Sequence, residues 1–252
     1  MHLQRQLVWA ACVALCLLGS GCEQEPAAPD TSQVGEELLA SRLGEMHNRA
    51  LAAIAMRAGD KRGAFTDPEA YLDLVTEAAA AELQDWQVDP VVIRCLASKT
   101  LETVLEFHRD HVLDLRHMTI ADDDLLWATM VSRGFMTARD VEAVTREVAK
   151  VRGEVGSDAR ANQYDAGSLM CASALDIFRH SHEYWHSDKR PDRDDLIFAL
   201  YDLSGAFQGG FWGLVWGGPL GALIGEFVGA VTVSAICYFA PPSFSECEIG
   251  DS

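Results

Sequence analysis

The chain has 252 residues, which suffices for one large domain or two small ones. It carries 20 Lys and Arg against 38 Asp and Glu, so its formal net charge is −18 at pH 7, and its isoelectric point is about 4.7. Nucleic-acid binding needs a basic surface, and adhesion to anionic lipid headgroups also relies on basic residues. The composition therefore argues against both, and any affinity for membranes must come from apolar surface or from an attached lipid.

The first 22 residues have the pattern of a secretion signal. Arg5 supplies a positive start, Leu7 to Leu18 is an apolar run of secretory length, and Gly-Ser-Gly-Cys follows. This end resembles the lipobox of bacterial lipoproteins, although its leucine stands four positions before the cysteine and the usual spacing is three. The resemblance implies a lipoprotein-type signal peptide over residues 1–21 and lipidation of Cys22. The alternative is a plain signal peptide cleaved nearby, with Cys22 incidental.

The cysteines agree with export. Cys12 and Cys16 would leave with the signal, and Cys22 would carry the lipid. Four cysteines then remain for an oxidising compartment, and the sequence cannot choose among their three possible pairings. They are Cys95, Cys171, Cys237 and Cys247. A Cys237–Cys247 disulfide, between the two closest in sequence, would tie down a C-terminal tail of residues 241–252, whereas four buried thiols are the alternative.

Helix signals recur from residue 34 onward, whereas strand signals are nearly absent. Residues 22–33 are polar, contain proline and predict a flexible tether. Apolar periodicity and caps then predict successive helices. The expected ranges are 34–58, 66–83, 89–115, 125–132, 137–152, 158–186 and a last helix from 194. We therefore expect an all-α fold, a helical bundle of about eight helices, with a helical domain over 34–190 and a hairpin over 191–240.

Local signals set several of these boundaries. Gly59 is placed to end the first helix. Residues 66–69 (TDPE) form a capping box with proline in the first turn, and Asp89 precedes Pro90 at the next start. Thr137 and the aspartate three residues later open a further helix.

Glycine recurs at every fourth position late in the chain. The series is Gly205, Gly209, Gly213, Gly217, Gly221, Gly225 and Gly229. A step of four keeps these residues on one stripe of a helix, where a second backbone can approach closely. Glycine costs about 1 kcal/mol per residue in a helix relative to alanine, so seven in register require a packing reason. We expect all seven to be helix-packing residues.

Pro219 lies within this run and predicts a kink or a hairpin, because proline breaks a helix interior. The two arms would be Ala199–Trp216 and Pro219–Phe239, each close to the roughly 20 residues that a bilayer demands. Glu226 is the only charge between Leu203 and Ala240. Two interpretations stay open: the buried centre of a soluble bundle, in which Glu226 reaches the surface, or a hairpin inserted in a membrane. A lipid at Cys22 would already anchor the protein, which favours the buried interpretation.

The secretion signal with Cys22 and the glycine run together resemble the glycine-zipper lipoproteins of bacterial envelopes. The longer layout is similar to a diffuse group of uncharacterised exported bacterial proteins. Their Leu-Gly-x-x-His-Asn element matches Leu43–Asn48, their Tyr-Trp element matches Tyr184–Trp185, and their terminal glycine zipper matches Gly205–Gly229. The resemblance implies an exported, lipid-anchored protein of the cell envelope, and it brings no activity.

Residues 182–186 read HEYWH, a literal HExxH. On a helix, His182 and His186 would share one face and could both bind zinc, while Glu183 would activate a bound water as the catalytic residue. The sequence gives no second motif for a third ligand. The candidates are Glu226, Asp192, Asp194, Asp195 and Asp202. The alternative is a solvated helix end without metal, which we favour because the helix ends directly after the motif.

Three functions follow from these observations. The first is an exported, lipid-anchored envelope protein without enzymatic activity or cofactor, with its glycine hairpin buried or membrane-associated. The second is a zinc-dependent metallopeptidase using residues 182–186. The third is a secreted membrane-active protein of pore-forming or bacteriocin type, which the acidic composition disfavours. The expected partner is the membrane, contacted through Cys22. The 205–240 hairpin as a further membrane contact and a second copy of the chain as a partner stay open, and no nucleic acid is expected.

Overall fold

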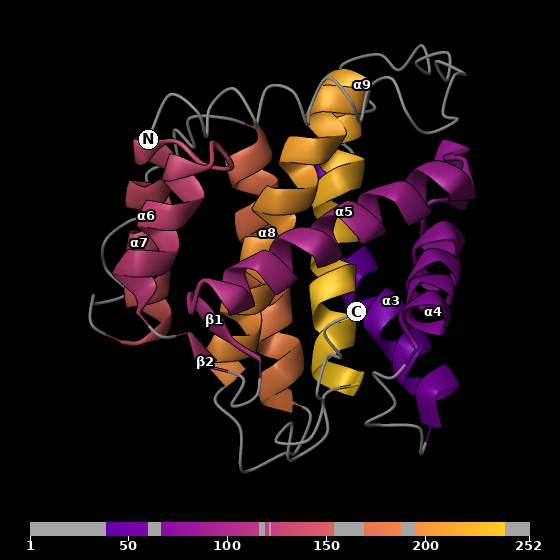
Figure 1. Cartoon of the computed structure of the whole chain (residues 1–252), viewed down its shortest axis with the longest axis horizontal. Coiled ribbons are helices and arrows are strands. Elements are labelled where there is room, and N and C mark those ends of the chain that lie inside the picture. The colour runs from indigo at the N-terminus through magenta and orange to yellow at the C-terminus, as the bar shows by residue number, and fades with distance from the viewer. Residues whose placement is uncertain are drawn as a thin grey trace. The chain divides into compact units, whose positions relative to one another are not determined.

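The computed structural model describes residues 39–59, 67–115, 119–120, 122–153, 169–187 and 195–239. These residues belong to one compact unit, Thr31–Ser252, and the all-α class predicted from the sequence is confirmed for them (Figure 1). The α-helices are α3 (Leu43–Ala58), α4 (Pro68–Glu82), α5 (Pro90–Arg109), α6 (Asp123–Ser132), α7 (Ala138–Val151), α8 (Leu169–Ser187) and α9 (Asp195–Phe239). A 3-10 turn, η2 (Gln84–Trp86), and two short strands, β1 (Leu113–Asp114) and β2 (Thr119–Ile120), complete the described elements.

Side-chain caps explain where several helices begin. The side chain of Asp67 accepts hydrogen bonds from the backbone N–H groups of Glu69 and Ala70 and so caps α4. The predicted box had placed this cap at Thr66, one residue too early. Because a residue before proline avoids the helical region, the helix can start only at Pro68, and the cap falls on Asp67. Asp89 caps α5 in the same way, as predicted.

Thr137 and Asp140 form the expected capping box at the start of α7, each side chain bonding the backbone of the other. Gly59 ends α3 at φ 47°, also as predicted. Arg133 is the C-cap of α6, and Gly134, at φ 79°, follows it directly. A left-handed residue at this position is the common way to end a helix, and glycine adopts it without strain.

The helix predicted over residues 89–115 ends earlier, at Arg109. His111 has a left-handed backbone, with φ 59°, and the N–H of Val112 bonds the carbonyl of Phe107. Leu113 then pairs with Ile120 in the antiparallel ladder of β1 and β2. Val112 and Leu113 are both buried. These residues are apolar because they are buried and not because they are helical. For this reason the apolar periodicity predicts a helix that is six residues too long at its C-terminal end.

The long helix α9 occupies the middle of the unit and packs against α3, α4, α5 and α8 (Figure 1). Its backbone is non-helical at Gly217 and Gly218, where Gly218 has φ 61° and ψ −151°. Glycine alone adopts this conformation readily. Pro219 follows directly and starts the second arm, a position where its missing N–H costs no helix hydrogen bond. The break predicted from Pro219 thus lies at the two residues before it.

The two arms of α9 meet through glycine. A Cβ atom built on Gly209 would overlap the carbonyl oxygen of Gly225 and lie 2.8 Å from the Cα of Gly229. The same overlap arises in two further antiparallel pairs, Gly213 with Gly221 and Gly205 with Gly229. In these three pairs, backbone packs against backbone. We call this contact between the two arms the glycine seam. Gly217 is different, because a Cβ there would meet nothing within 4 Å.

Most of α9 is buried. By length and composition alone, Asp195–Ile236 is apolar enough to cross a membrane, the single such segment among the residues described. However, 89% of its most apolar window is buried inside the protein, and the core helix of a soluble protein has the same properties. Glu226, expected at the surface in the buried interpretation, is instead completely buried.

Candidate functional site

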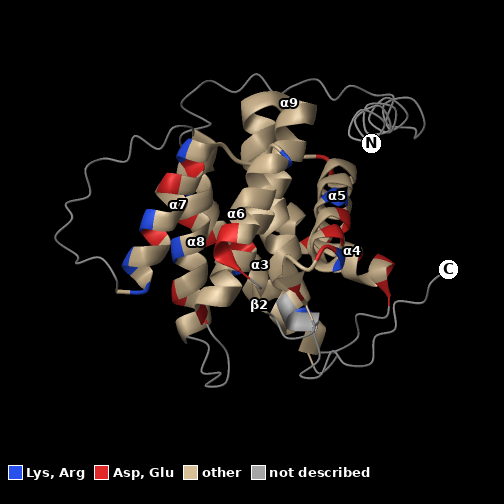
Figure 2. Ribbon diagram, turned by 60° about the vertical axis from the view of Figure 1, so that its left-hand side comes forward, with Lys and Arg blue, Asp and Glu red and all other residues tan. Residues whose placement is uncertain are grey.

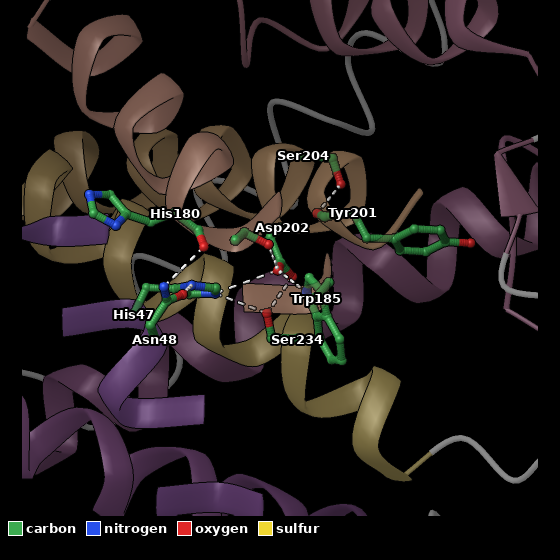
Figure 3. Close-up of polar contacts among 9 residues, drawn as sticks. His47, Asn48, His180, Trp185, Tyr201, Asp202, Ser204 and Ser234 are labelled. Carbon is green, nitrogen blue, oxygen red and sulfur yellow. Dashed lines mark hydrogen bonds and ion pairs between the residues drawn. The ribbon is translucent and has the colours of Figure 1, made fainter. Parts of the chain in front are cut away.

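A cluster of polar side chains lies inside the core where α3, α8 and both arms of α9 meet (Figure 3). We call it the polar centre, and it consists of His47, Ser181, Trp185, Asp202 and Ser234. Trp185 is 3% exposed and the other four are completely buried. α3, α8 and each arm of α9 thus contribute at least one polar side chain to the buried core. Such groups destabilise a core unless they satisfy one another.

Asp202 accepts most of the hydrogen bonds of the polar centre. Its Oδ2 lies 2.5 Å from the Ser181 hydroxyl and 3.1 Å from the Trp185 indole nitrogen, and both groups donate to it. Its Oδ1 accepts a hydrogen bond from the Ser234 hydroxyl. His47 Nε2 lies 3.6 Å from Oδ2. Three donors and a nearby imidazole therefore compensate a carboxylate held in the core.

Each ring nitrogen of His47 has a polar side chain beside it. Nε2 lies 2.9 Å from the Ser234 hydroxyl oxygen, and Nδ1 lies 3.2 Å from the side-chain oxygen of Asn48. Because Ser234 donates its one proton to Asp202, its oxygen accepts from Nε2–H. The Asn48 amide nitrogen donates to the carbonyl of His180, 2.9 Å away. This chain of bonds joins α3 to α8 and to both arms of α9.

Burial dominates the electrostatics of the pair. It lowers the pKa of His47, and the charge of Asp202 opposes this shift. Burial likewise raises the pKa of Asp202, opposed by the charge of His47 and by the bonds from Ser181 and Ser234. Each partner thus reduces the cost of burying the other.

The residue types of the polar centre are those of a serine hydrolase, but their arrangement is not. A catalytic serine donates to the histidine, which is oriented by the aspartate through its other nitrogen. Here Ser234 donates to Asp202 directly, and the second nitrogen of His47 faces Asn48. Complete burial also keeps any substrate away. The arrangement can hold helices in register, and it cannot perform acyl transfer.

The motif elements singled out in the sequence meet at this place. Gly44 lies so close to α8 that an added Cβ would overlap the ring of His180, and its N–H donates to Asp176 Oδ2 at 3.1 Å. His47, from the same element, and Trp185, from the Tyr-Trp element, both reach Asp202. Sequence reasoning missed Asp202 and Ser234 as members. The available signal was Asp202 itself, the last acid before a run of 23 uncharged residues.

The HExxH residues lie near the end of α8. The rings of His182 and His186 stack at 6.1 Å between centroids, so they share one face as predicted. His186 is 77% exposed and its Nδ1 lies 2.9 Å from Asp195 Oδ2. Glu183 is exposed. Within the described ranges, no three His, Cys, Asp or Glu side chains are grouped closely enough to hold a metal ion.

The predicted third ligands do not gather around the two histidines. Asp202 is committed to the polar centre, and Glu226 is buried against Ser173, whose hydroxyl donates to its Oε2. Asp195 lies beside His186, with its Oδ2 2.9 Å from Nδ1. Asp192 and Asp194 lie outside the described residues. A complete zinc site is thus not formed by the side chains that the structure describes.

Glu226 is a completely buried acid in the second arm of α9, directly after Gly225 of the glycine seam. Its Oε1 has no hydrogen-bond partner, and its side chain packs against Gly210. Burial raises its pKa well above the usual value of 4.5. The raised pKa favours the neutral carboxylic acid, because an unpaired buried carboxylate is far more costly.

The cysteine predictions fall mainly outside the described residues. Cys22 and Cys247 lie there, and so does the side chain of Cys237, so neither the lipidation nor the disulfide is tested. Cys171 is buried beside Asp140, and burial raises the pKa of its thiol to about 12. Such a thiol is not a nucleophile at neutral pH.

Comparisons with protein-family models, with curated proteins and with solved structures give no match. No relative therefore supplies a function, and the chain's own residues are the only basis for one.

Proposed function

We propose that this protein is an exported, lipid-anchored protein of the bacterial envelope that acts without enzymatic chemistry. Its glycine-zipper hairpin forms the buried centre of a helical bundle, and the lipid on Cys22 attaches that bundle to the membrane. The observation that carries the buried hairpin is the contact between Gly209 and Gly225 and the two pairs beside it, whereas the anchor rests on the signal pattern that ends at Cys22. The glycine stripe of each arm is thus covered by the other arm of the same chain.

Two features support the buried interpretation over a membrane span. The polar centre places Asp202 and Ser234 of α9 against partners on α3 and α8, so both arms need the rest of the bundle. The neighbouring helices cover α9 on several sides. A glycine face already filled by the second arm also leaves no stripe for a second chain. Self-association through the zipper is therefore not part of the proposal.

The non-enzymatic part of the proposal rests on where the reactive side chains lie. The Ser, His and Asp of the polar centre are sealed in the core, and the thiol of Cys171 is buried. His182 and His186 form a pair of potential ligands without a third among the described residues. The exposed surface of the described helices instead carries ion pairs, such as Arg133 with Glu106 and Asp110.

The attachment is tested by the mass of the N-terminal peptide. The protein exported by bacterial cells should begin at Cys22 and carry a diacylglycerol, and labelled palmitate should enter the parent but not the Cys22→Ser variant. A mature N-terminus elsewhere, without lipid, contradicts the anchor. The buried hairpin is a separate claim, which membrane partitioning of a chain without the lipid tests.

A further inference from the structure

The turn between the arms of α9 exposes large apolar side chains. Leu214, Val215 and Trp216 are 48%, 57% and 42% exposed, and Pro219 after the turn is exposed as well. We call residues 214–219 the apolar tip. In a helix that is otherwise mostly buried, three consecutive exposed apolar residues are exceptional, and exposed apolar patches mark interaction sites.

No charge lies near the apolar tip along the chain. Residues 203–225 contain no Asp, Glu, Lys or Arg. Figure 2 shows the labelled end of α9 without charged residues, whereas α4, α5 and α7 carry them. Leu169, 39% exposed, begins α8 at this same end, since Met170 packs beside Gly210.

We propose that the apolar tip inserts into the interface of a lipid bilayer. Tryptophan beside leucine and valine suits that depth, because its ring is apolar with one polar edge. The net charge of −18 disfavours anionic headgroups, so the contact is apolar and suits zwitterionic lipid. This inference rests on the proposed function only in that the anchor brings the tip close to a membrane.

The length of the predicted tether and the small size of the apolar tip both favour the bilayer over a protein partner. Eleven residues of the predicted tether, 23–33, follow Cys22, and an extended chain of that length spans about 36 Å. The tether is therefore long enough for the tip to face the bilayer that holds the lipid. A stable interface between two copies needs roughly 20–30 residues a side, many more than the tip provides.

The test uses the full chain as cells export it, mixed with phosphatidylcholine vesicles that carry bromine on the acyl chains, which quench tryptophan by contact. The parent should be quenched. Trp216→Phe should lose most of this quenching, while the matched control Trp86→Phe, at a half-buried position on η2, should keep it. Equal quenching in the two variants, or none in the parent, overturns the inference.

Two further measurements separate the outcomes. Leu214→Ser with Val215→Ser should reduce quenching, whereas Met56→Ser with Val91→Ser, which removes exposed apolar side chains from other helices, should not. A concentration-dependent dimer that the tip substitutions abolish without affecting quenching would assign the tip to a second copy and overturn lipid insertion. The mass of the N-terminal peptide is measured on the same sample. A lipidated chain without tip quenching refutes only the tip, and an unlipidated chain with tip quenching refutes only the anchor.

Discussion

His47 Nε2 lies 3.6 Å from Asp202 Oδ2, and both side chains are completely buried. The two residues are far apart in sequence and come from α3 and the first arm of α9. Their contact joins the start of the described chain to its centre. Because both side chains have hydrogen-bond partners inside the core, removal of either one leaves buried polar groups unpaired, and its loss should be costly.

Asp202→Ala should therefore destabilise the fold by about 3–5 kcal/mol, because it leaves the buried donors Ser181, Trp185 and Ser234 without their acceptor. Urea unfolding at pH 7 measures the change. Asp85→Ala, at an exposed aspartate on η2, is the control and should stay within about 0.5 kcal/mol of the parent. An equal, small loss in both variants would show that the polar centre contributes little.

Glu226 predicts a pH dependence of stability. Its pKa is raised in the folded state, so the folded state holds a proton that the unfolded chain releases at about pH 4.5. The stability associated with this group is complete below that pH and is lost as the pH rises toward the raised pKa, at about 1.4 kcal/mol per unit. Glu226→Gln removes the titration, so its stability relative to the parent should increase with pH.

The measurement is urea unfolding of parent and variant from pH 4 to pH 8, compared as a difference so that other groups cancel. Glu183→Gln, at an exposed position, serves as the control and should show a flat difference. A flat difference for Glu226→Gln as well would mean that the carboxyl group is not held neutral.

The glycine seam predicts different costs at two positions of the one glycine series. Gly209→Ala puts a methyl group against the Gly225 carbonyl and should force the arms apart, at a cost of about 1–3 kcal/mol or more. Gly217→Ala, at φ −140° with open space around it, should change stability by less than about 1 kcal/mol. Thermal unfolding compares the two. Equal costs would indicate that helix propensity, and not close packing, explains the glycines.

The HExxH motif predicts zinc only if a third ligand exists. We expect purified protein to contain no stoichiometric zinc by elemental analysis, and added zinc to leave the melting temperature unchanged, since a tight ligand of the folded state would raise it. His182→Ala provides the matched comparison. One zinc per chain, lost in this variant together with a drop in melting temperature, would favour the metallopeptidase.

The sequence predicts helix ends and breaks correctly where a few adjacent residues determine them. Asp89 before Pro90, the Thr137–Asp140 box and the break beside Pro219 each depend on a few adjacent residues. The end of α5 was missed, because Val112 and Leu113 are buried outside any helix and burial alone produces the same apolar pattern.

The polar centre could not be predicted in the same way. His47 and Ser234 are 187 positions apart, and neither belongs to a periodic pattern that would pair them. His47, Asn48 and Trp185 were noticed only as parts of short motifs. What brings them together is the packing of α3 and α8 on the two arms of α9, which depends on the glycine seam. Such a site follows from tertiary packing and not from spacing along the chain.

The central claim is that the glycine hairpin is the core of the folded body and not its membrane anchor. Its most direct test is the membrane partitioning of a Cys22→Ser chain exported through a plain, cleavable signal, with processing verified by the mass of its N-terminus. After alkaline extraction of the membranes, the account predicts this chain in the soluble fraction, while the lipidated parent stays with the membrane. Retention of the Cys22→Ser chain in the extracted membrane would show that the hairpin spans the bilayer and would contradict the account.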